Sequence, residues 1–157
     1  MPDRTYREAV TVDGRNIVLD HQNSPVADRA VVEAGDALFK LDVFDAAFRP
    51  ENHSKADGAP LRLFDARTVR VDLSKRSQED MGFRRRNIDF HEIVFCVRGA
   101  LRWETEIGVT TLKAGEMILI PRGISHRSML CSDSAEENVL LDLRIDDEIT
   151  FVGRAKG

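Results

Sequence analysis

The sequence has few of the features that mark secreted or membrane proteins. Its 157 residues include only two cysteines, Cys96 and Cys131, which are too few for a disulfide framework and lack the spacing of a metal site. No apolar run approaches the ~20 residues of a membrane-spanning helix, and the opening MPDRTYREAV lacks the apolar core of a signal peptide. We therefore expect a cytoplasmic chain with two reduced thiols and no membrane partner.

An excess of basic charge is also missing. The formal net charge is −4, so neither nucleic acid nor an anionic membrane is expected as a partner. Hydrophobic residues make up 42% of the chain and charged residues 32%, which argues against disorder. The length suits one domain with a substantial core.

Helical patterns are scarce, and short alternating patterns dominate. Residues 9–20 alternate on both sides of Asp13-Gly14, which predicts a tight hairpin. Only residues 24–37 have a pattern compatible with a helix. Further strands are predicted at 37–44 (where a short helix is the alternative), 67–75, 88–99, 100–112, 116–121, 125–131 and 138–145. Short strands at this spacing, separated by turns, are typical of an all-β sandwich or barrel.

One predicted strand ends in a distinctive pattern. In GEMILIPRGISH (115–126), the first Gly, Pro121, Gly123 and His126 are separated by five, one and two residues. This pattern resembles the second conserved motif of the cupin superfamily. The family usually has an Asn four residues after the His, where this chain has Leu130.

A second motif lies upstream. Glu92, followed by Gly99 after six intervening residues, resembles the second half of the first cupin motif. Residues 86–127 resemble the N-terminal, iron-free cupin domain of homogentisate 1,2-dioxygenases and related proteins. That likeness is carried by Asn87-x-Asp89, Thr105-Glu106-Ile107-Gly108 and Ile120-Pro121-Arg122-Gly123. The resemblance covers residues 83–145 and implies an all-β, single-domain cupin: a double-stranded β-helix, or jelly-roll barrel, with an N-terminal strand extension.

Within that fold we expect three segments. Residues 1–60 would supply strands and a loop that pack on the barrel, residues 61–150 the barrel core, and residues 151–157 a C-terminal tail. Open sheet edges need cover, so pairing as a homodimer is expected.

The resemblance also implies where a metal would bind. Cupins hold a divalent metal with two His and one Glu from the first motif and one His from the second, and Glu92 and His126 stand at two of these positions. The span expected to hold the other histidines is Arg85-Arg86-Asn87-Ile88, in which only Asn87 offers a side-chain oxygen. His91 directly precedes Glu92 and points to the opposite face unless a bulge intervenes. We therefore predict no cofactor. A bound iron, manganese, zinc or nickel ion would use Glu92 and His126 with Asn87 or His91.

Without a metal, Glu92 and His126 are expected to face one another in a largely apolar lumen lined by Val94 and Ile118. A buried carboxylate must be paired or neutral, and the imidazole is its natural partner. Two interpretations stay open: a catalytic general acid/base pair, or a satisfied polar pair without a chemical role. Cys96 shares the strand parity of Glu92 at roughly 13 Å, and is either a lining residue of the ligand site or a small buried hydrophobe.

Three consecutive arginines precede the first motif. Arg84 and Arg86 share strand parity with Glu92 if no bulge intervenes, whereas Arg85 points away. Together with Asn87, they are candidates to hold a substrate carboxylate, which an arginine does by bidentate hydrogen bonds. The alternative is a solvated basic edge, or a charge pair across a dimer with the acidic DDE that follows the last strand.

Two classes of function follow. In the first, the chain is a small cupin with a degenerate metal site that binds a small organic acid, aromatic acids included, or acts as a non-catalytic partner of another protein. In the second, it is a divalent-metal-dependent, dioxygenase-like enzyme of aromatic or small-acid catabolism. The missing histidine pair favours the first. The single tyrosine, Tyr6, argues against a sugar epimerase of this barrel type, and the absence of Gly-x-Ser-x-Gly argues against a serine hydrolase.

Overall fold

The structure is a computed structural model that describes residues 5–22, 39–79 and 81–153 of the chain. The chain divides into two compact units, Met1–Asp42 and Val43–Gly157. Strands β1 (Thr5–Val12) and β2 (Arg15–Gln22) form a hairpin in the first unit, and only Asp13 and Gly14 connect them. Both connecting residues have positive φ, 49° and 74°, as a two-residue type I′ turn requires. The hairpin predicted for residues 9–20 is confirmed and is longer than its sequence pattern indicated.

The strand predicted at 37–44 is wrong for the residues that the structure describes, because these form turns and coil. Phe44 and Asp45, at the start of the second unit, instead contact side chains of that unit. The carbonyl of Asp45 accepts a hydrogen bond from Nζ of the buried Lys75 at 2.9 Å, and the guanidinium carbon of Arg98 lies 3.9 Å from the centre of the Phe44 ring. These two residues add no strand to a sheet.

Helices are nearly absent from the described ranges, as the sequence predicted. The only helix there is a one-turn 3-10 helix, η2 (Glu51–His53), and no helix is long and apolar enough to cross a bilayer. On η2, Asn52 donates from Nδ2 to Ser74 Oγ at 2.9 Å and accepts at Oδ1 from the backbone N–H of Lys75 at 3.1 Å. Residues 43–60 thus belong to the barrel unit. The helix that residues 24–37 would allow lies outside the described residues.

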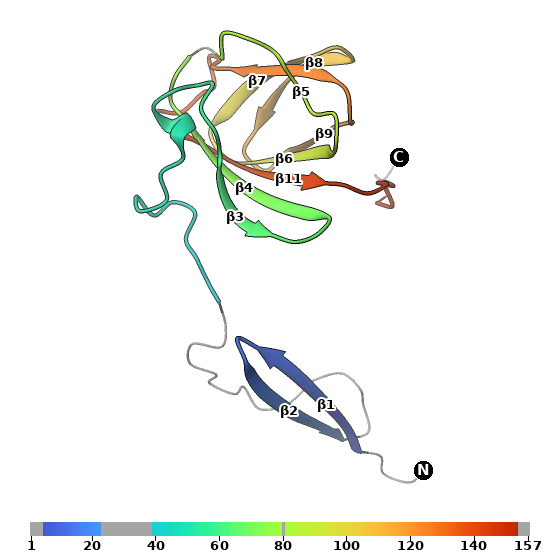
Figure 1. Ribbon diagram of the computed structural model, residues 1–157. Coiled ribbons are helices and arrows are strands. Elements are labelled where there is room, and N and C mark those ends of the chain that lie inside the picture. Colours follow the sequence, from blue (N-terminus) through green and yellow to red (C-terminus); the bar gives the residue numbers. More distant parts are fainter. Residues whose placement is uncertain (1–4, 23–38, 80, 154–157) are drawn as a thin grey trace. The chain divides into compact units, whose positions relative to one another are not determined.

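The second unit consists of two antiparallel sheets that enclose a common interior (Figure 1). The first sheet has the strand order β5 (Arg85–Arg86), β10 (Ser125–Met129), β7 (Ala100–Thr105) and β8 (Gly108–Lys113). The second has the order β3 (Leu61–Asp65), β4 (Val69–Arg76), β11 (Asn138–Ile145), β6 (His91–Arg98) and β9 (Met117–Ile120). The predicted all-β jelly-roll barrel is confirmed.

Most barrel strands lie where the alternating patterns predicted them. Strand β11 has the predicted bounds, and the range 100–112 divides into β7 and β8 at the turn Glu106-Ile107. Strands β3 and β5 are additions. The register of β3 shifts between Arg62 and Phe64, and β5 has two residues, so neither leaves a regular alternation in the sequence.

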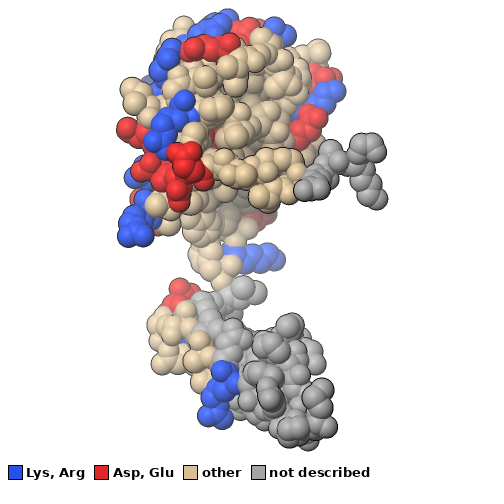
Figure 2. Space-filling model, turned by 90° about the vertical axis from the view of Figure 1, so that its right-hand side faces the viewer, with Lys and Arg blue, Asp and Glu red and all other residues tan. Residues whose placement is uncertain are grey.

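Buried residues of the barrel separate into two groups. We call the first the apolar half: Val94, Cys96, Leu101, Trp103, Leu112, Ile120 and Leu140. We call the second the polar half: Asn52, Ser74, Arg76, Asp142 and the partly buried Arg144. Seen from the side at which β11 ends, the barrel carries its Lys, Arg, Asp and Glu mainly at the margins, around an uncharged middle (Figure 2).

Candidate functional site

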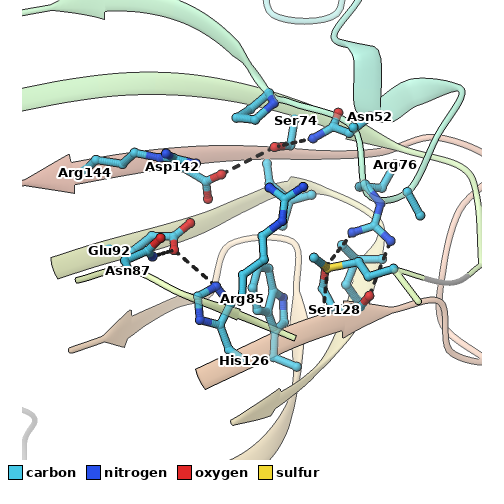
Figure 3. Close-up of a pocket in the computed structure, with 17 residues that line it drawn as sticks. Asn52, Ser74, Arg76, Arg85, Asn87, Glu92, His126, Ser128, Asp142 and Arg144 are labelled. Atoms are coloured by element: carbon cyan, nitrogen blue, oxygen red, sulfur yellow. Dashed lines mark hydrogen bonds and ion pairs between the residues drawn. The ribbon is translucent and has the colours of Figure 1, made fainter. Parts of the chain in front are cut away.

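A cavity of about 120 Å³ lies inside the barrel, mainly against the polar half (Figure 3). Its walls come from η2 and the loop after it, from β4, β5, β6, β7, β10 and β11, and from residues between these strands. The lumen was expected to be largely apolar, but Val94 packs in the apolar half and Ile118 packs against it. The cavity walls contain charged and polar side chains instead, because β4 and β11 turn their polar residues inward.

Glu92 and His126 meet in this cavity, as predicted from the two motifs. Glu92 Oε2 lies 3.5 Å from His126 Nε2, and both residues are 5% exposed. Asn87 donates from Nδ2 to the same carboxylate oxygen at 2.6 Å. The strand alternation of β6 turns Glu92 inward, and the central position of β10 between β5 and β7 places His126 opposite it. Three of the residues proposed from sequence therefore form one cluster.

The hydrogen bond of the other imidazole nitrogen fixes the orientation of this pair. His126 Nδ1 lies 3.1 Å from the carbonyl oxygen of Ile124, which can only accept, so Nδ1 carries a proton. Nε2 is then the nitrogen that gains or loses a proton, and it faces Glu92. The pair can share one proton between a carboxylate and an imidazole, which is the property of a general acid/base pair.

The donor set does not fit a tightly held transition metal. In the part of the chain that the structure describes, no group of three or more His, Cys, Asp or Glu side chains is placed to hold one ion. His91 is not a third ligand, because its Nδ1 accepts a hydrogen bond from the backbone N–H of Arg122 at 2.9 Å and its side chain does not line the cavity. Asn87 turns its N–H group towards Glu92. Two ligands remain, Glu92 and His126, fewer than such sites use.

Asp142 belongs to the site and was not found from the sequence. It is 6% exposed on β11, and its Oδ2 accepts from Ser74 Oγ at 3.4 Å. Burial, followed by the negative charge of Glu92, raises the pKa of Asp142 well above its usual value, which favours the protonated form. In the sequence Asp142 alternates with Leu141 and Leu143, a pattern that normally places the charged residue in solvent. No local signal marks it as an interior residue.

The arginines around the cavity differ from those expected. Arg85 lines the cavity, and its guanidinium extends into the middle of the view in Figure 3 and donates to the carbonyl of Asp57. Arg86 is exposed and binds Glu106 Oε1 at 2.6 Å, and Arg84 is exposed as well. The parity argument fails because β5 pairs with β10 and does not continue into β6, so the alternation of β6 does not extend back to these residues.

Two further arginines of the polar half line the cavity, and sequence reasoning missed both. Arg76 on β4 donates to the side chain of Ser128. Arg144 on β11 forms an ion pair with Asp72 Oδ2 at 3.0 Å. With Arg85, they place three guanidinium groups around one small cavity.

Cys96 does not line the cavity. It is fully buried in the apolar half, where burial raises the pKa of its thiol, and its Sγ lies 3.5 Å from the carbonyl oxygens of Arg98 and Gly99. Trp103 packs in the apolar half on one side. On its other side it lines the cavity, with its ring centre 6.0 Å from that of His126.

Comparisons with known proteins match this architecture. The profile of the AraC-like ligand binding domain family matches residues 69–129. No curated protein matches the sequence. A putative mannose-6-phosphate isomerase from Ralstonia eutropha JMP134 superposes with a TM-score of 0.54 at 18% identity, over 70% of this chain and 100% of that one. The cupin domain of Cnp3 from Schizosaccharomyces pombe superposes with a TM-score of 0.52 at 7% identity, over 91% and 88%. At these identities the similarity is one of fold.

Proposed function

We propose that this protein, whose barrel is a cupin-type domain, binds a small organic acid in the barrel cavity. The single observation that carries the proposal is the set of three arginines, Arg76, Arg85 and Arg144, around a cavity whose own carboxyl groups are few. Guanidinium groups recognise carboxylates by paired, charge-assisted hydrogen bonds, which are among the strongest polar contacts in proteins.

The charges of the lining favour an anion. Two carboxyl groups, Glu92 and Asp142, share the wall with the three arginines. Burial raises the pKa of Asp142, which opposes its ionisation, and Glu92 accepts from the amide of Asn87 and lies beside His126. Arg144 is paired with Asp72 at 3.0 Å, whereas the guanidinium group of Arg85 donates to a neutral carbonyl, that of Asp57. The positive charge of Arg85 in a low-dielectric interior would attract a carboxylate.

The size of the cavity limits the ligand. A volume of about 120 Å³ corresponds to about four water molecules at ~30 Å³ each, so an acid of a few non-hydrogen atoms fits. A simple aromatic acid would require the cavity to widen. The AraC-like family that matches residues 69–129 is named for ligand binding, which supports a binding role for this barrel.

The test uses the single tryptophan of the chain, Trp103, as a reporter in the cavity wall. Titration with acetate, glycolate, propionate and lactate should change its fluorescence in a saturable manner. Arg85→Ala should weaken binding by about tenfold or more, because a charge-assisted contact is lost. Arg84→Ala is the matched control, since Arg84 is the exposed neighbour. If none of the four acids binds at millimolar concentration, the proposal fails.

We also propose that the protein forms a homodimer through the outer face of the five-stranded sheet. Two rows of apolar side chains cross four strands of this face. One row consists of Val71, Leu143, Ile93 and Leu119, and the next of Leu73, Leu141, Phe95 and Met117. Leu119 and Met117 are 45% and 58% exposed, Val71, Leu143 and Ile93 are half-buried, and Leu73 is completely buried. The exposed part of the two rows therefore lies towards β9.

The lack of charge favours a second copy as the occupant. Four strands at about 4.8 Å spacing, each with two outward positions about 6.6 Å apart, give the two rows a footprint of about 250 Å². An interface of the standard ~800 Å² per partner would include the polar margin around them. A face without charges in either row is self-complementary about a twofold axis, since it juxtaposes no like charges.

Sedimentation of the full chain at 1 to 100 μM tests the dimer. Wild type should sediment as a dimer, and Leu143→Lys as a monomer, because a charge would be buried at the centre of the interface. Ile88→Lys is the control, since Ile88 is 72% exposed and belongs to neither row. A monomeric wild type, or a dimeric Leu143→Lys variant, contradicts the proposal.

A further inference from the structure

The indole and carboxyl groups of two cavity-lining residues each lack a hydrogen bond at one atom within the described ranges. Among the described residues, Nε1 of Trp103 and Oδ1 of Asp142 are buried and have no hydrogen-bond partner, and each residue is 6% exposed. Most buried polar groups in proteins are hydrogen-bonded, and an unsatisfied one costs free energy. A ligand group that reached each of these atoms would therefore remove this cost.

The indole N–H can only donate, so the partner of Trp103 must be an acceptor. The oxygen of a ligand carboxylate meets this requirement, and Arg85 would supply the positive charge beside it. The requirement of Trp103 is therefore consistent with the organic acid proposed above, but it does not specify a second functional group.

Asp142 indicates what the second functional group of the ligand is. Asn52 Nδ2 donates to Ser74 Oγ at 2.9 Å, which leaves the hydroxyl proton of Ser74 for Oδ2 of Asp142. The direction of this chain is fixed, because an amide N–H cannot accept. Oδ2 is therefore an acceptor already in use, and Oδ1 is the atom that remains for the ligand.

A hydroxyl group is the partner that suits Oδ1 in either protonation state. It donates to Oδ1 when the carboxyl group is ionised and accepts from it when Oδ1 carries the proton. A keto oxygen satisfies only the protonated form, and a methyl group satisfies neither.

We infer that the ligand is a small hydroxy acid, whose hydroxyl group pairs with Asp142 Oδ1 and whose carboxylate accepts from Trp103 Nε1. This inference rests on the proposed function and adds the chemical class of the ligand. The cavity volume suits acids such as glycolate and lactate.

Two pairs of acids that differ by one hydroxyl group test the inference: glycolate against acetate, and lactate against propionate. By isothermal titration calorimetry, the hydroxy acid of each pair should bind wild type about tenfold or more tightly, because only it satisfies Asp142. If all four acids bind with ratios near one, the inference fails while the proposed function stands. If none binds, the proposed function itself fails. Pyruvate that binds as tightly as lactate also overturns the inference.

Two variants separate the roles of the two atoms. Asp142→Leu, of similar size, should reduce the hydroxy-acid preference to about one. Trp103→Phe removes the donor N–H together with part of the ring system and should weaken both members of each pair by a similar factor, leaving their ratio unchanged. A retained preference in Asp142→Leu contradicts the assignment. The ratios measured on wild type decide the ligand class even if a variant does not fold.

Discussion

The two halves of the barrel interior bury opposite kinds of side chain, apolar in one half and polar in the other. In the apolar half, β6 and β7 turn residues such as Val94 and Leu101 inward, as expected for a sheet with one buried face. In the polar half, β4 and β11 turn Ser74 and Asp142 inward, and Leu141 and Leu143 point to the other face of β11. Alternation defines two faces of a strand without stating which of them is interior. The reversal places polar side chains around the cavity, where we propose that the ligand binds.

The largest effect is expected in the apolar half. Leu101 is completely buried, and Leu101→Ala should lower the free energy of unfolding by about 2–5 kcal/mol through lost burial and a residual cavity. Val109→Ala, at a 54% exposed position of β8, is the control and should cost about 1 kcal/mol or less. Urea denaturation measures both. Equal losses would show that the two positions are not packed as described.

A smaller, pH-dependent effect of opposite sign is expected in the polar half. The pKa of Asp142 is raised in the folded protein by burial and by Glu92. Above the usual value of 3.8, the folded state therefore retains a proton that the unfolded chain has released. Stability contributed by this group is complete below that value and is lost as the pH rises towards the folded pKa, by up to about 1.4 kcal/mol per pH unit.

Asp142→Asn should remove this slope and should be more stable than wild type at neutral pH. Urea denaturation of both proteins between pH 4 and 8 measures the difference. The control is Asp146→Asn, at an exposed position just beyond β11, whose curve should run parallel to that of wild type. A wild type whose stability increased with pH relative to Asp142→Asn would show that Asp142 is ionised in the fold.

The metal affinity of the cavity tests whether the polar side chains of the interior form a metal site. Glu92 and His126 provide two ligands, so wild type purified without chelator should hold well under one transition-metal ion per chain by elemental analysis. Asn87→His would add an imidazole next to Glu92 and should raise zinc or nickel affinity by about tenfold or more. Stoichiometric metal in wild type, lost in both Glu92→Ala and His126→Ala, would instead support the metal-dependent enzyme.

The smallest effect concerns the two thiols. Cys96 is completely buried in the apolar half and has a raised pKa, whereas Cys131 is half-buried outside it. A thiol reagent should therefore modify Cys131 first in the native protein, with Cys96 reacting only on unfolding. Cys131→Ser should abolish the fast phase of the reaction, and Cys96→Ser should leave it unchanged. The reverse order would contradict the packing of the apolar half.

The sequence predicted the positions of those residues that belong to a local pattern or motif. The Asp13-Gly14 turn, the bounds of β11 and the placement of Glu92 near His126 follow from patterns within single strands and motifs. The arginines show where such reasoning ends. Arg85 lines the cavity and Arg86 does not, because a short strand pairs with β10 before the chain enters β6.

By itself, the sequence determined that this chain forms short antiparallel strands, since alternation and turn residues act over a few positions. Its resemblance to the two cupin motifs implied that a carboxylate and an imidazole come together inside a barrel. Only the tertiary structure decided that Asp142 and three arginines share that interior. The reason is physical: which face of a strand is buried depends on what packs against it, and those contacts come from residues far away in the chain.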